Sequence, residues 1–293
     1  MIPVMNITAW SKTVPWAEQR QVEQDLIISR ALVELFSDPF LRDNLRFRGG
    51  TALNKLHFPQ PMRYSEDIDL VRTEASPIGP ILGRMREVLE PWLGRAAFDQ
   101  SPVAPKLRFR VPTEDKISTG DIRLKVEINT REIEIYDRPN VISFHVENPW
   151  FFGATEIPTF THEEMLATKL RALLQRDKGR DLFDLAHALD VFEELDAGRV
   201  IEYFQRYLGR TDLKILRAEA EKRMFSKLRE PGFLNDMRPL LAVSEAERLT
   251  EAEMRKAFVR VFQNFIIALP GEPWKKTNEM IDRFDLPLVK SNG

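Results

Sequence analysis

Two aspartates separated by one residue are the first candidates for chemistry in this sequence. Asp67 and Asp69 flank Ile68 in the segment SEDIDL, which alternates polar and apolar residues as a β-strand does. Side chains alternate between the two faces of a strand, so both carboxylates point to one face and the apolar residues point to the core. Neighbouring carboxylates repel each other unless positive charge lies beside them. Mg²⁺ is a natural partner, because it binds carboxylates together with substrate phosphates.

A glycine pair precedes the aspartates. Gly49 and Gly50 follow Phe47, and a short helix is expected over residues 51–56. Glycine lets the backbone approach a ligand closely, and the first N–H groups of a helix can bind phosphate. Thr51 can cap this helix or donate its hydroxyl to a phosphate oxygen. Each motif alone also fits an ordinary turn or a solvated strand face. Together, in the order strand, turn, helix, strand, they predict a site for a triphosphate and its metal ions.

A third carboxylate is expected on the strand over residues 121–130, DIRLKVEINT. Its apolar residues form one face, and its charged residues form the other. If this strand lies near residues 65–71, Glu127 joins the two aspartates, and Lys125 or Arg123 screens their charge. The alternative is an amphipathic strand with an exposed surface of lysine and glutamate.

The composition excludes several kinds of chemistry. Of 293 residues, 43% are hydrophobic and 30% are charged, as in an ordinary folded globular protein. The net charge of −2 excludes a global basic field, so contact with nucleic acid must rest on local patches. The absence of cysteine excludes disulfides, thiolate metal centres and a cysteine nucleophile. The four histidines are scattered without paired metal-ligand spacing.

The N-terminal segment lacks the basic region and apolar run of a secretory signal. Uncharged apolar stretches, such as residues 265–269, are too short to span a bilayer. We therefore expect a cytoplasmic protein that makes no membrane contact.

The chain changes character near residue 155. Before it, the patterns predict helices over residues 16–36 and 78–93 and strands over residues 63–71, 106–111 and 121–130. After it, they predict only helices, over residues 161–176, 181–193, 198–207, 213–228 and 248–267. This order predicts an α+β protein in which a mixed sheet with flanking helices occupies residues 1–157. A helical C-terminal domain, residues 158–293, would complete the active-site cleft.

The second half also carries candidate cations. Lys169 and Arg176 lie on the predicted helix 161–176, and Arg180 precedes Asp181, a good N-cap for the next helix. The segment 206–229, which includes Arg210 and Asp212, has eight positive and three negative charges, and Lys106, Arg108 and Arg110 share one face of their strand. These groups are candidates for an RNA or polyphosphate surface, and the alternative is a solvated, salt-bridged surface.

At this point the motifs resemble a known family. GGT followed by RYSEDIDL is similar to the AbiEii/AbiGii-type nucleotidyltransferase toxins, which include the mycobacterial MenT toxins. These toxins belong to the DNA polymerase β-like nucleotidyltransferases, whose signature is GG(S/T) followed by a DxD. The segment EEMLATKLRALLQRDKGRDLFDLAHAL is also similar, with a lysine on one helix and Arg-Asp-x-x-Asp opening the next.

The resemblance implies a nucleotidyltransferase-like fold and a set of site residues. Asp67 and Asp69 would bind the catalytic Mg²⁺. Glu127, which the strand pattern rather than the resemblance indicates, is expected as a further metal ligand. Lys169 would contact the triphosphate, and Asp181 would be essential. The family also implies an antitoxin encoded alongside, and some members transfer nucleotides to the 3′ end of tRNA. The expected nucleotide-binding residues are Gly49, Gly50, Thr51, Ser65 and Arg180.

The leading hypothesis is a Mg²⁺-dependent nucleotidyltransferase that moves NMP from an NTP onto an acceptor, foremost the 3′ end of tRNA. It would act as the toxin of a toxin–antitoxin or phage-defence pair. One alternative is a glycosyltransferase whose DxD holds a nucleotide sugar, which would turn over sugar nucleotides without releasing pyrophosphate from NTP. Another is a non-catalytic nucleotide-binding module, which would bind NTP tightly without any transfer.

Overall fold

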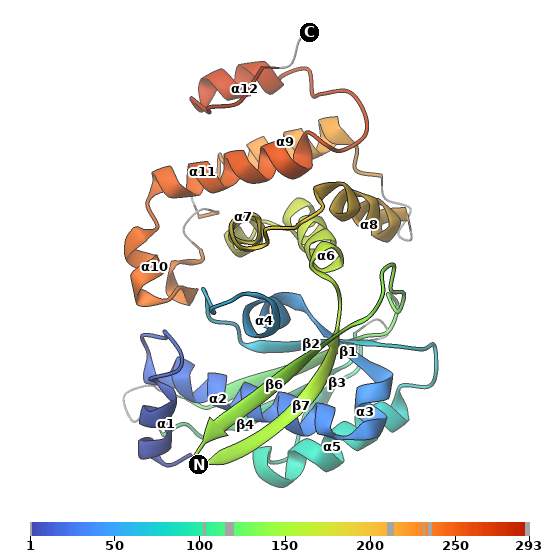
Figure 1. Ribbon diagram of the computed structural model, residues 1–293, viewed down its shortest axis with the longest axis vertical. Helices are drawn as coiled ribbons and strands as arrows, with labels where there is room; N and C mark the ends of the chain where they lie inside the picture. The colour runs from blue at the N-terminus through green and yellow to red at the C-terminus, as the bar shows by residue number, and fades with distance from the viewer. Residues whose placement is uncertain are drawn as a thin grey trace. The chain divides into compact units, whose positions relative to one another are not determined.

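The computed structural model describes residues 2–101, 104–114, 120–209, 214–230, 232–233 and 236–290. The chain divides into two compact units, Met1–Thr161 and His162–Gly293. The first unit is built on a mixed seven-stranded sheet with helices around it, and the elements of the second unit are helices (Figure 1). The predicted α+β class, with a helical C-terminal region, is confirmed.

The first unit contains helices α1 (Val4–Trp10), α2 (Gln19–Ser37), α3 (Pro39–Asn44), α4 (Gly49–Ala52) and α5 (Gly79–Leu93), and η1 (Leu53–His57) continues α4 as a π-helix. The strands of this unit are β1 (Leu45–Arg48), β2 (Asp67–Arg72), β3 (Ala97–Asp99), β4 (Lys106–Val111), β5 (Ile122–Asn129), β6 (Asn140–Asn148) and β7 (Phe151–Thr159).

The strand order places the predicted acidic strands side by side. The order is β3-β4-β5-β2-β1-β7-β6, with β2 parallel to β5 and β1 parallel to β7. Helices α2 and α5 pack against β5 and β4 respectively. The apolar positions of β2, β4 and β5 are buried, as the alternation of these strands predicts: Ile68, Leu70, Leu107, Phe109, Ile122, Leu124, Val126 and Ile128. Their polar neighbours therefore share the opposite face.

One predicted strand in this unit starts later than expected. Strand β2 begins at Asp67, whereas the pattern predicts a strand from residue 63. The backbone at Met62 and Arg63 is instead held by a side chain, because both N–H groups donate to Asn54 Oδ1 at 3.2 and 3.3 Å. These bonds draw residues 62–63 toward the helix that follows the glycine pair.

The second unit consists of helices α6 (His162–Gln175), α7 (Gly179–Val191), α8 (Ala197–Gly209), α9 (Arg217–Lys227), α10 (Val243–Arg248), α11 (Glu251–Val261) and α12 (Thr277–Arg283), with the short helices η2 (Arg238–Leu240) and η3 (Phe262–Ile266). Three buried phenylalanines form part of its core. The ring centroid of Phe225 lies 6.0 Å from that of Phe258 and 5.2 Å from that of Phe262.

Two predicted helix starts are corrected in this unit. Helix α7 begins at Gly179, so Asp181 is its third residue and not its N-cap. The Gly179 N–H donates to Asp236 Oδ1 at 3.0 Å, and a Cβ on Gly179 would lie 3.3 Å from the Phe233 carbonyl carbon. A glycine is therefore required by close packing at this start. Helix α9 begins at Arg217 rather than residue 213, and Arg210, Asp212 and Leu213 lie outside the described residues.

In the described part of the chain, none of the helices combines the length and the apolar character that crossing a bilayer requires.

Candidate active site

The glycine turn lies directly against the second aspartate. Strand β1 ends at Arg48, and Gly49 adopts φ +84°, a left-handed conformation that favours glycine. A Cβ on Gly49 would lie 3.0 Å from the Asp69 Cβ and would meet the Asp69 carboxylate. Helix α4 starts here without a side-chain cap. The start of α4 therefore has no side-chain cap, and it lies within contact distance of the Asp69 carboxylate.

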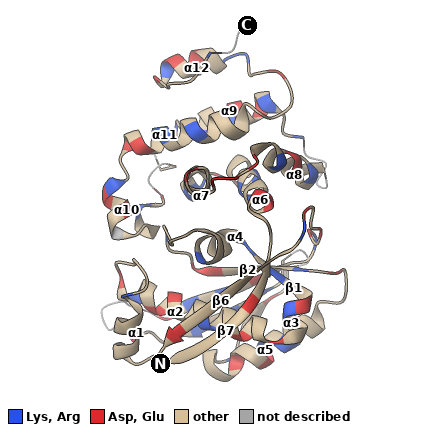
Figure 2. Ribbon diagram, viewed as in Figure 1, with Lys and Arg blue, Asp and Glu red and all other residues tan. Residues whose placement is uncertain are grey.

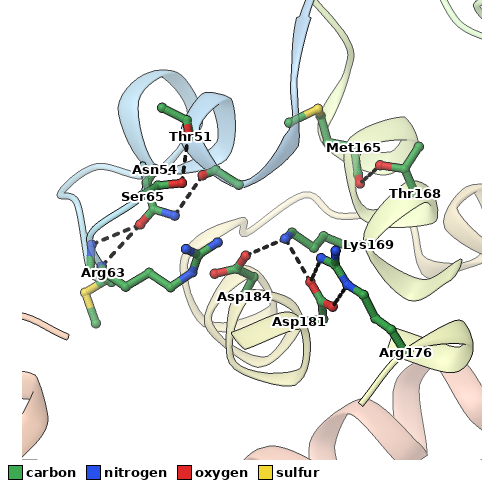
Figure 3. A network of polar contacts seen from close by, with 12 residues as sticks. Thr51, Asn54, Arg63, Ser65, Met165, Thr168, Lys169, Arg176, Asp181 and Asp184 are labelled. Carbon is green, nitrogen blue, oxygen red and sulfur yellow. Dashed lines mark hydrogen bonds and ion pairs between the residues drawn. The ribbon is translucent and has the colours of Figure 1, made fainter. Parts of the chain in front are cut away.

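A buried arginine lies beside the same turn. The Arg63 side chain is buried, and a Cβ on Gly50 would lie 3.4 Å from its Cζ. Asn54 ties this region together, because its Nδ2 donates to the Gly50 carbonyl at 3.0 Å and its Oδ1 accepts from the backbone of Arg63 (Figure 3). Positive charge is thus held at the start of the helix, where an anion would bind.

Thr51 fastens the helix to the acidic strand. Its side chain is buried, and its hydroxyl donates to the Asp67 carbonyl. The Ser65 hydroxyl lies 2.7 Å from the same oxygen of Thr51 (Figure 3). The hydroxyl of Thr51 is therefore engaged within the protein, and this bond fixes the glycine turn relative to β2.

The three predicted carboxylates meet on one face of the sheet. In the parallel pair β2–β5, Asp69 lies opposite Glu127 and Asp67 lies opposite Lys125. Lys125 Nζ is 2.8 Å from Asp67 Oδ2 and 3.3 Å from Glu127 Oε2. Lys106 Nζ approaches Glu127 Oε2 at 3.5 Å. We call Asp67, Asp69, Glu127 and Lys125 the carboxylate corner.

The carboxylate corner has more negative than positive charge. Burial raises the pKa of Asp69, and the negative charge of Asp67 raises it further. The charges of Lys125 and Arg48 oppose this rise but do not cancel it. Burial acts to lower the pKa of Lys125, but its bond to Asp67 and the negative charges around it outweigh burial and raise the pKa. The corner would therefore gain from an added cation.

A second charged cluster lies within the second unit. Lys169, on α6, is buried, and its Nζ lies 3.0 Å from Asp181 Oδ1 and 2.9 Å from Asp184 Oδ2, both on α7. Arg176 binds Asp181 through two nitrogens, at 2.7 and 2.9 Å (Figure 3). The two aspartates are fully buried. We call Lys169, Arg176, Asp181 and Asp184 the buried cluster.

The buried cluster holds the Asp181 carboxylate ionised. Burial acts to raise the pKa of Asp181, but the charge of Lys169 and the hydrogen bonds from Arg176 outweigh it and hold the pKa well below its usual range. Arg180 lies on the same helix, half-buried, and its charge contributes to lowering the pKa of Asp236. Burial is the larger influence on Asp236 and raises its pKa.

Comparison with known proteins identifies the family. Residues 30–273 match the family described as nucleotidyl transferase AbiEii toxin, type IV TA system. The chain belongs to this family. The first unit and the second unit both fall largely within the match, so the family assignment covers both charged clusters. The resemblance expected from the GGT and SEDIDL motifs is confirmed.

The fold of this AbiEii nucleotidyltransferase is shared with a solved structure. The chain is similar to MenT4, a nucleotidyltransferase toxin from Mycobacterium tuberculosis, with a TM-score of 0.56 and 18% identity over 97% of this chain and 99% of that one. It is also similar to JHP933 from Helicobacter pylori, with a TM-score of 0.48 and 20% identity over 85% and 95% of the two chains. No curated protein sequence matches the chain.

The residues predicted from the sequence form two groups in the AbiEii fold. The first unit brings together Gly49, Gly50, Thr51, Ser65, Asp67, Asp69 and Glu127, and the second unit brings Lys169 and Asp181 into one ion-pair cluster. Sequence reasoning missed three contributors, namely Asn54, Arg63 and the pairing of Asp184 with Lys169. Asp184 is the last residue of the Arg-Asp-x-x-Asp motif, so its spacing from Asp181 was a usable signal.

The donor set of the carboxylate corner fits a magnesium ion. In the regions of the chain that the structure describes, no three His, Cys, Asp or Glu side chains already form a metal-ligand cluster. Lys125 offsets part of the negative charge that a metal ion would neutralise, by pairing with Asp67 and Glu127. Carboxylate oxygens are the ligands that Mg²⁺ prefers. Burial and, after it, repulsion from Asp67 raise the pKa of Asp69, and a bound cation would relieve the repulsion.

Proposed function

We propose that this AbiEii nucleotidyltransferase moves NMP from an NTP onto the 3′ end of an RNA, foremost tRNA, in a Mg²⁺-dependent reaction. The observation that carries the proposal is the contact of the Gly49 turn with Asp69, which itself lies opposite Glu127. A phosphate-binding turn and a set of carboxylates thus adjoin each other within one unit. In this proposal the protein acts in the cytoplasm, as a toxin that a cognate antitoxin neutralises.

The glycine turn binds the triphosphate in this proposal. The uncapped helix start offers backbone N–H groups, and Arg63 adds positive charge beside Gly50. The Thr51 hydroxyl is committed to Asp67, so Thr51 offers its backbone N–H to the phosphate while its side chain positions the turn. Ser65, bonded to Thr51, supports the same arrangement.

The carboxylate corner would hold magnesium through Asp67, Asp69 and Glu127. When bound, Mg²⁺ supplies neutralisation of the negative charge that develops on the phosphates during transfer. Lys125 pairs with Asp67 and Glu127 and so offsets part of their negative charge. The turn and the corner together orient the α-phosphate toward the acceptor.

The transfer itself is a displacement at phosphorus. The acceptor hydroxyl oxygen bonds to the α-phosphorus, and the bond from that phosphorus to the bridging oxygen of pyrophosphate breaks. The hydroxyl proton is released to solvent, and pyrophosphate leaves. Positive charge near the leaving pyrophosphate stabilises it.

The buried cluster supplies such a charge in this proposal. Lys169 has three N–H donors, and Asp181 and Asp184 engage two of them. We assign the third donor to the triphosphate, and we assign Asp181 the role of holding the Lys169 ammonium in place. Arg180, on the same helix as Asp181, is a further candidate for contact with phosphate.

The experiment that tests the proposal incubates purified protein and Mg²⁺ with each of four α-labelled NTPs and total tRNA. We expect label at RNA 3′ ends with at least one NTP, and one pyrophosphate released for each nucleotide transferred. Parallel reactions with total RNA depleted of tRNA show whether tRNA is the acceptor. Absence of labelled product with all four NTPs, or turnover of a sugar nucleotide instead, would contradict the proposal.

A further inference from the structure

The face of the sheet that carries the carboxylate corner continues into a row of cations. In the pair β4–β5, Arg108 lies opposite Lys125, and Arg110 lies opposite Arg123. Because Lys125 in turn lies opposite Asp67, all these side chains point to the face of the aspartates. Figure 2 shows the acidic residues of β2 in red. We call Lys106, Arg108, Arg110 and Arg123 the basic strip.

The positions of two members of the basic strip, Arg110 and Arg123, destabilise the sheet. Arg110 and Arg123 are exposed and lie directly opposite each other, and like charges in this position destabilise a strand pair. Neither side chain forms an ion pair or hydrogen bond with another described residue. In contrast, Lys106 pairs with Glu127 at 3.5 Å and Arg108 pairs with Asp99 at 3.2 Å. An anionic ligand would relieve the repulsion between Arg110 and Arg123.

The strip and the glycine turn lie on opposite sides of the aspartates. In the strand order β4-β5-β2-β1, the turn follows β1, the aspartates lie on β2, and the strip lies on β5 and β4. A triphosphate bound at the turn therefore occupies the β1 side. The β5–β4 side is left for the second substrate, whose hydroxyl must reach the α-phosphate from the other direction.

We propose that the basic strip binds the phosphodiester backbone of the acceptor RNA and directs its 3′ end to the carboxylate corner. This inference rests on the proposed function, because it assigns a surface to the acceptor of that reaction. The strip offers a line of cations and no aromatic side chain on the same positions, so it contacts phosphates rather than bases. It therefore holds RNA of many sequences.

The test compares two double variants of equal charge change. Arg110→Gln/Arg123→Gln removes the unpaired cations of the strip, and Lys12→Gln/Arg42→Gln removes two cations near α1 and on α3. Binding of fluorescent tRNA without NTP is measured by anisotropy over a series of salt concentrations. Each lost phosphate contact lowers the slope of log affinity against log salt by about 0.7–0.9.

For the strip variant we expect RNA affinity to fall about 10-fold or more at low salt, with the salt slope reduced by about 1.4–1.8. We expect an unchanged KM for NTP, unchanged kcat at saturating RNA and a thermal midpoint no lower than wild type, because a like-charge pair is removed. The control variant should bind RNA as the wild type does.

Three outcomes would overturn the assignment: RNA affinity equal to wild type, an equal loss in the control variant, or a raised KM for NTP with RNA affinity intact. The last outcome would assign the strip to the triphosphate. The binding assay needs no catalysis, so it separates this inference from the proposed function. Wild-type protein that binds tRNA through the strip but transfers no nucleotide would contradict only the proposed function.

Discussion

The carboxylate corner and the buried cluster both combine aspartates with lysine, yet their electrostatics differ. At the corner, three carboxylates share Lys125 and a further contact from Lys106, and the pKa of Asp69 is raised by burial and by Asp67. In the buried cluster, two aspartates face Lys169 and Arg176, and the pKa of Asp181 is lowered despite burial. The corner has more negative than positive charge, whereas the charges of the buried cluster are balanced.

This difference assigns different work to the two clusters. A group of carboxylates with unmet negative charge is suited to receiving a cation and its phosphates. A balanced, buried set of ion pairs needs no added cation and fixes two helices relative to each other. The corner should therefore be sensitive to metal and substrate, whereas the cluster should be sensitive to anything that removes one of its charges.

Removal of divalent metal should have the largest effect, and only on the corner. We expect an excess of EDTA to abolish nucleotidyl transfer and added Mg²⁺ to restore it, because without a metal the negative charges of Asp67, Asp69 and Glu127 would repel the phosphates. The thermal midpoint should fall only by the small stabilisation that metal bound at the corner contributes, since the buried cluster needs no metal. Full activity in EDTA would show that the carboxylate corner needs no metal and would contradict this contrast with the buried cluster.

Asp181→Asn should lower the free energy of unfolding by about 3 kcal/mol, because it removes the negative charge that Lys169 and Arg176 share. The cost is moderated because Lys169 keeps Asp184 and Arg176 is partly exposed. Urea unfolding measures this change. The matched control is Asp190→Asn, which removes an exposed carboxylate of α7 that pairs with Arg260 of α11 and should cost less than about 1 kcal/mol. Equal losses of unfolding free energy in the two variants would show that the buried cluster stabilises the fold no more than an exposed ion pair does.

Gly49→Ala should reduce transfer about 100-fold, because the new Cβ meets Asp69 and φ +84° disfavours alanine. Gly83→Ala is the control. Gly83 lies within α5, and a Cβ added there would meet no atom within 4 Å, so alanine should leave transfer intact and raise stability by about 0.5–1 kcal/mol. Activity of Gly49→Ala near the wild-type level would show that transfer does not depend on the close contact between the turn and the carboxylate corner.

The smallest expected effect is a pH dependence that belongs to the buried cluster. The pKa of Asp181 lies below its ordinary value of 3.8, so this carboxylate stabilises the fold above that pH. The contribution is lost as the pH falls through the folded-state pKa. Urea unfolding between about pH 6 and pH 3 should show a decline in stability that is shallower in Asp181→Asn. Identical slopes in both proteins would contradict the assignment.

The sequence predicts the elements whose pattern repeats clearly. The strand over residues 106–111 coincides with β4, and the alternation in DIRLKVEINT correctly places Glu127 and Lys125 on one face. The hairpin of β6 and β7 escapes prediction, because β7 contains Gly153 and Pro158, which weaken a strand pattern. Strand β7 continues through Pro158 to Thr159, beyond residue 158, where the helical domain is predicted to start.

The site is predictable where chemistry and local spacing coincide, and not where partners come from distant segments. GGT and DxD are short motifs, so their residues can be named from the sequence. The contact of Gly49 with Asp69 and the bonds from Asn54 to Met62 and Arg63 depend on how the helix after the turn folds back on β2. Likewise, the pairing of Lys169 with Asp184 depends on the packing of α6 against α7.

The most direct test of the central claim compares Asp69→Asn with Glu66→Gln, an exposed carboxylate three residues earlier that lies outside the corner. Single-turnover transfer from labelled NTP to tRNA is measured together with the thermal midpoint. We predict that Asp69→Asn loses transfer by about 1000-fold or more while its thermal midpoint is unchanged or higher, since a buried charge is removed, and that Glu66→Gln resembles the wild type. Transfer by Asp69→Asn at the rate of Glu66→Gln would contradict the claim that the carboxylate corner is the catalytic site.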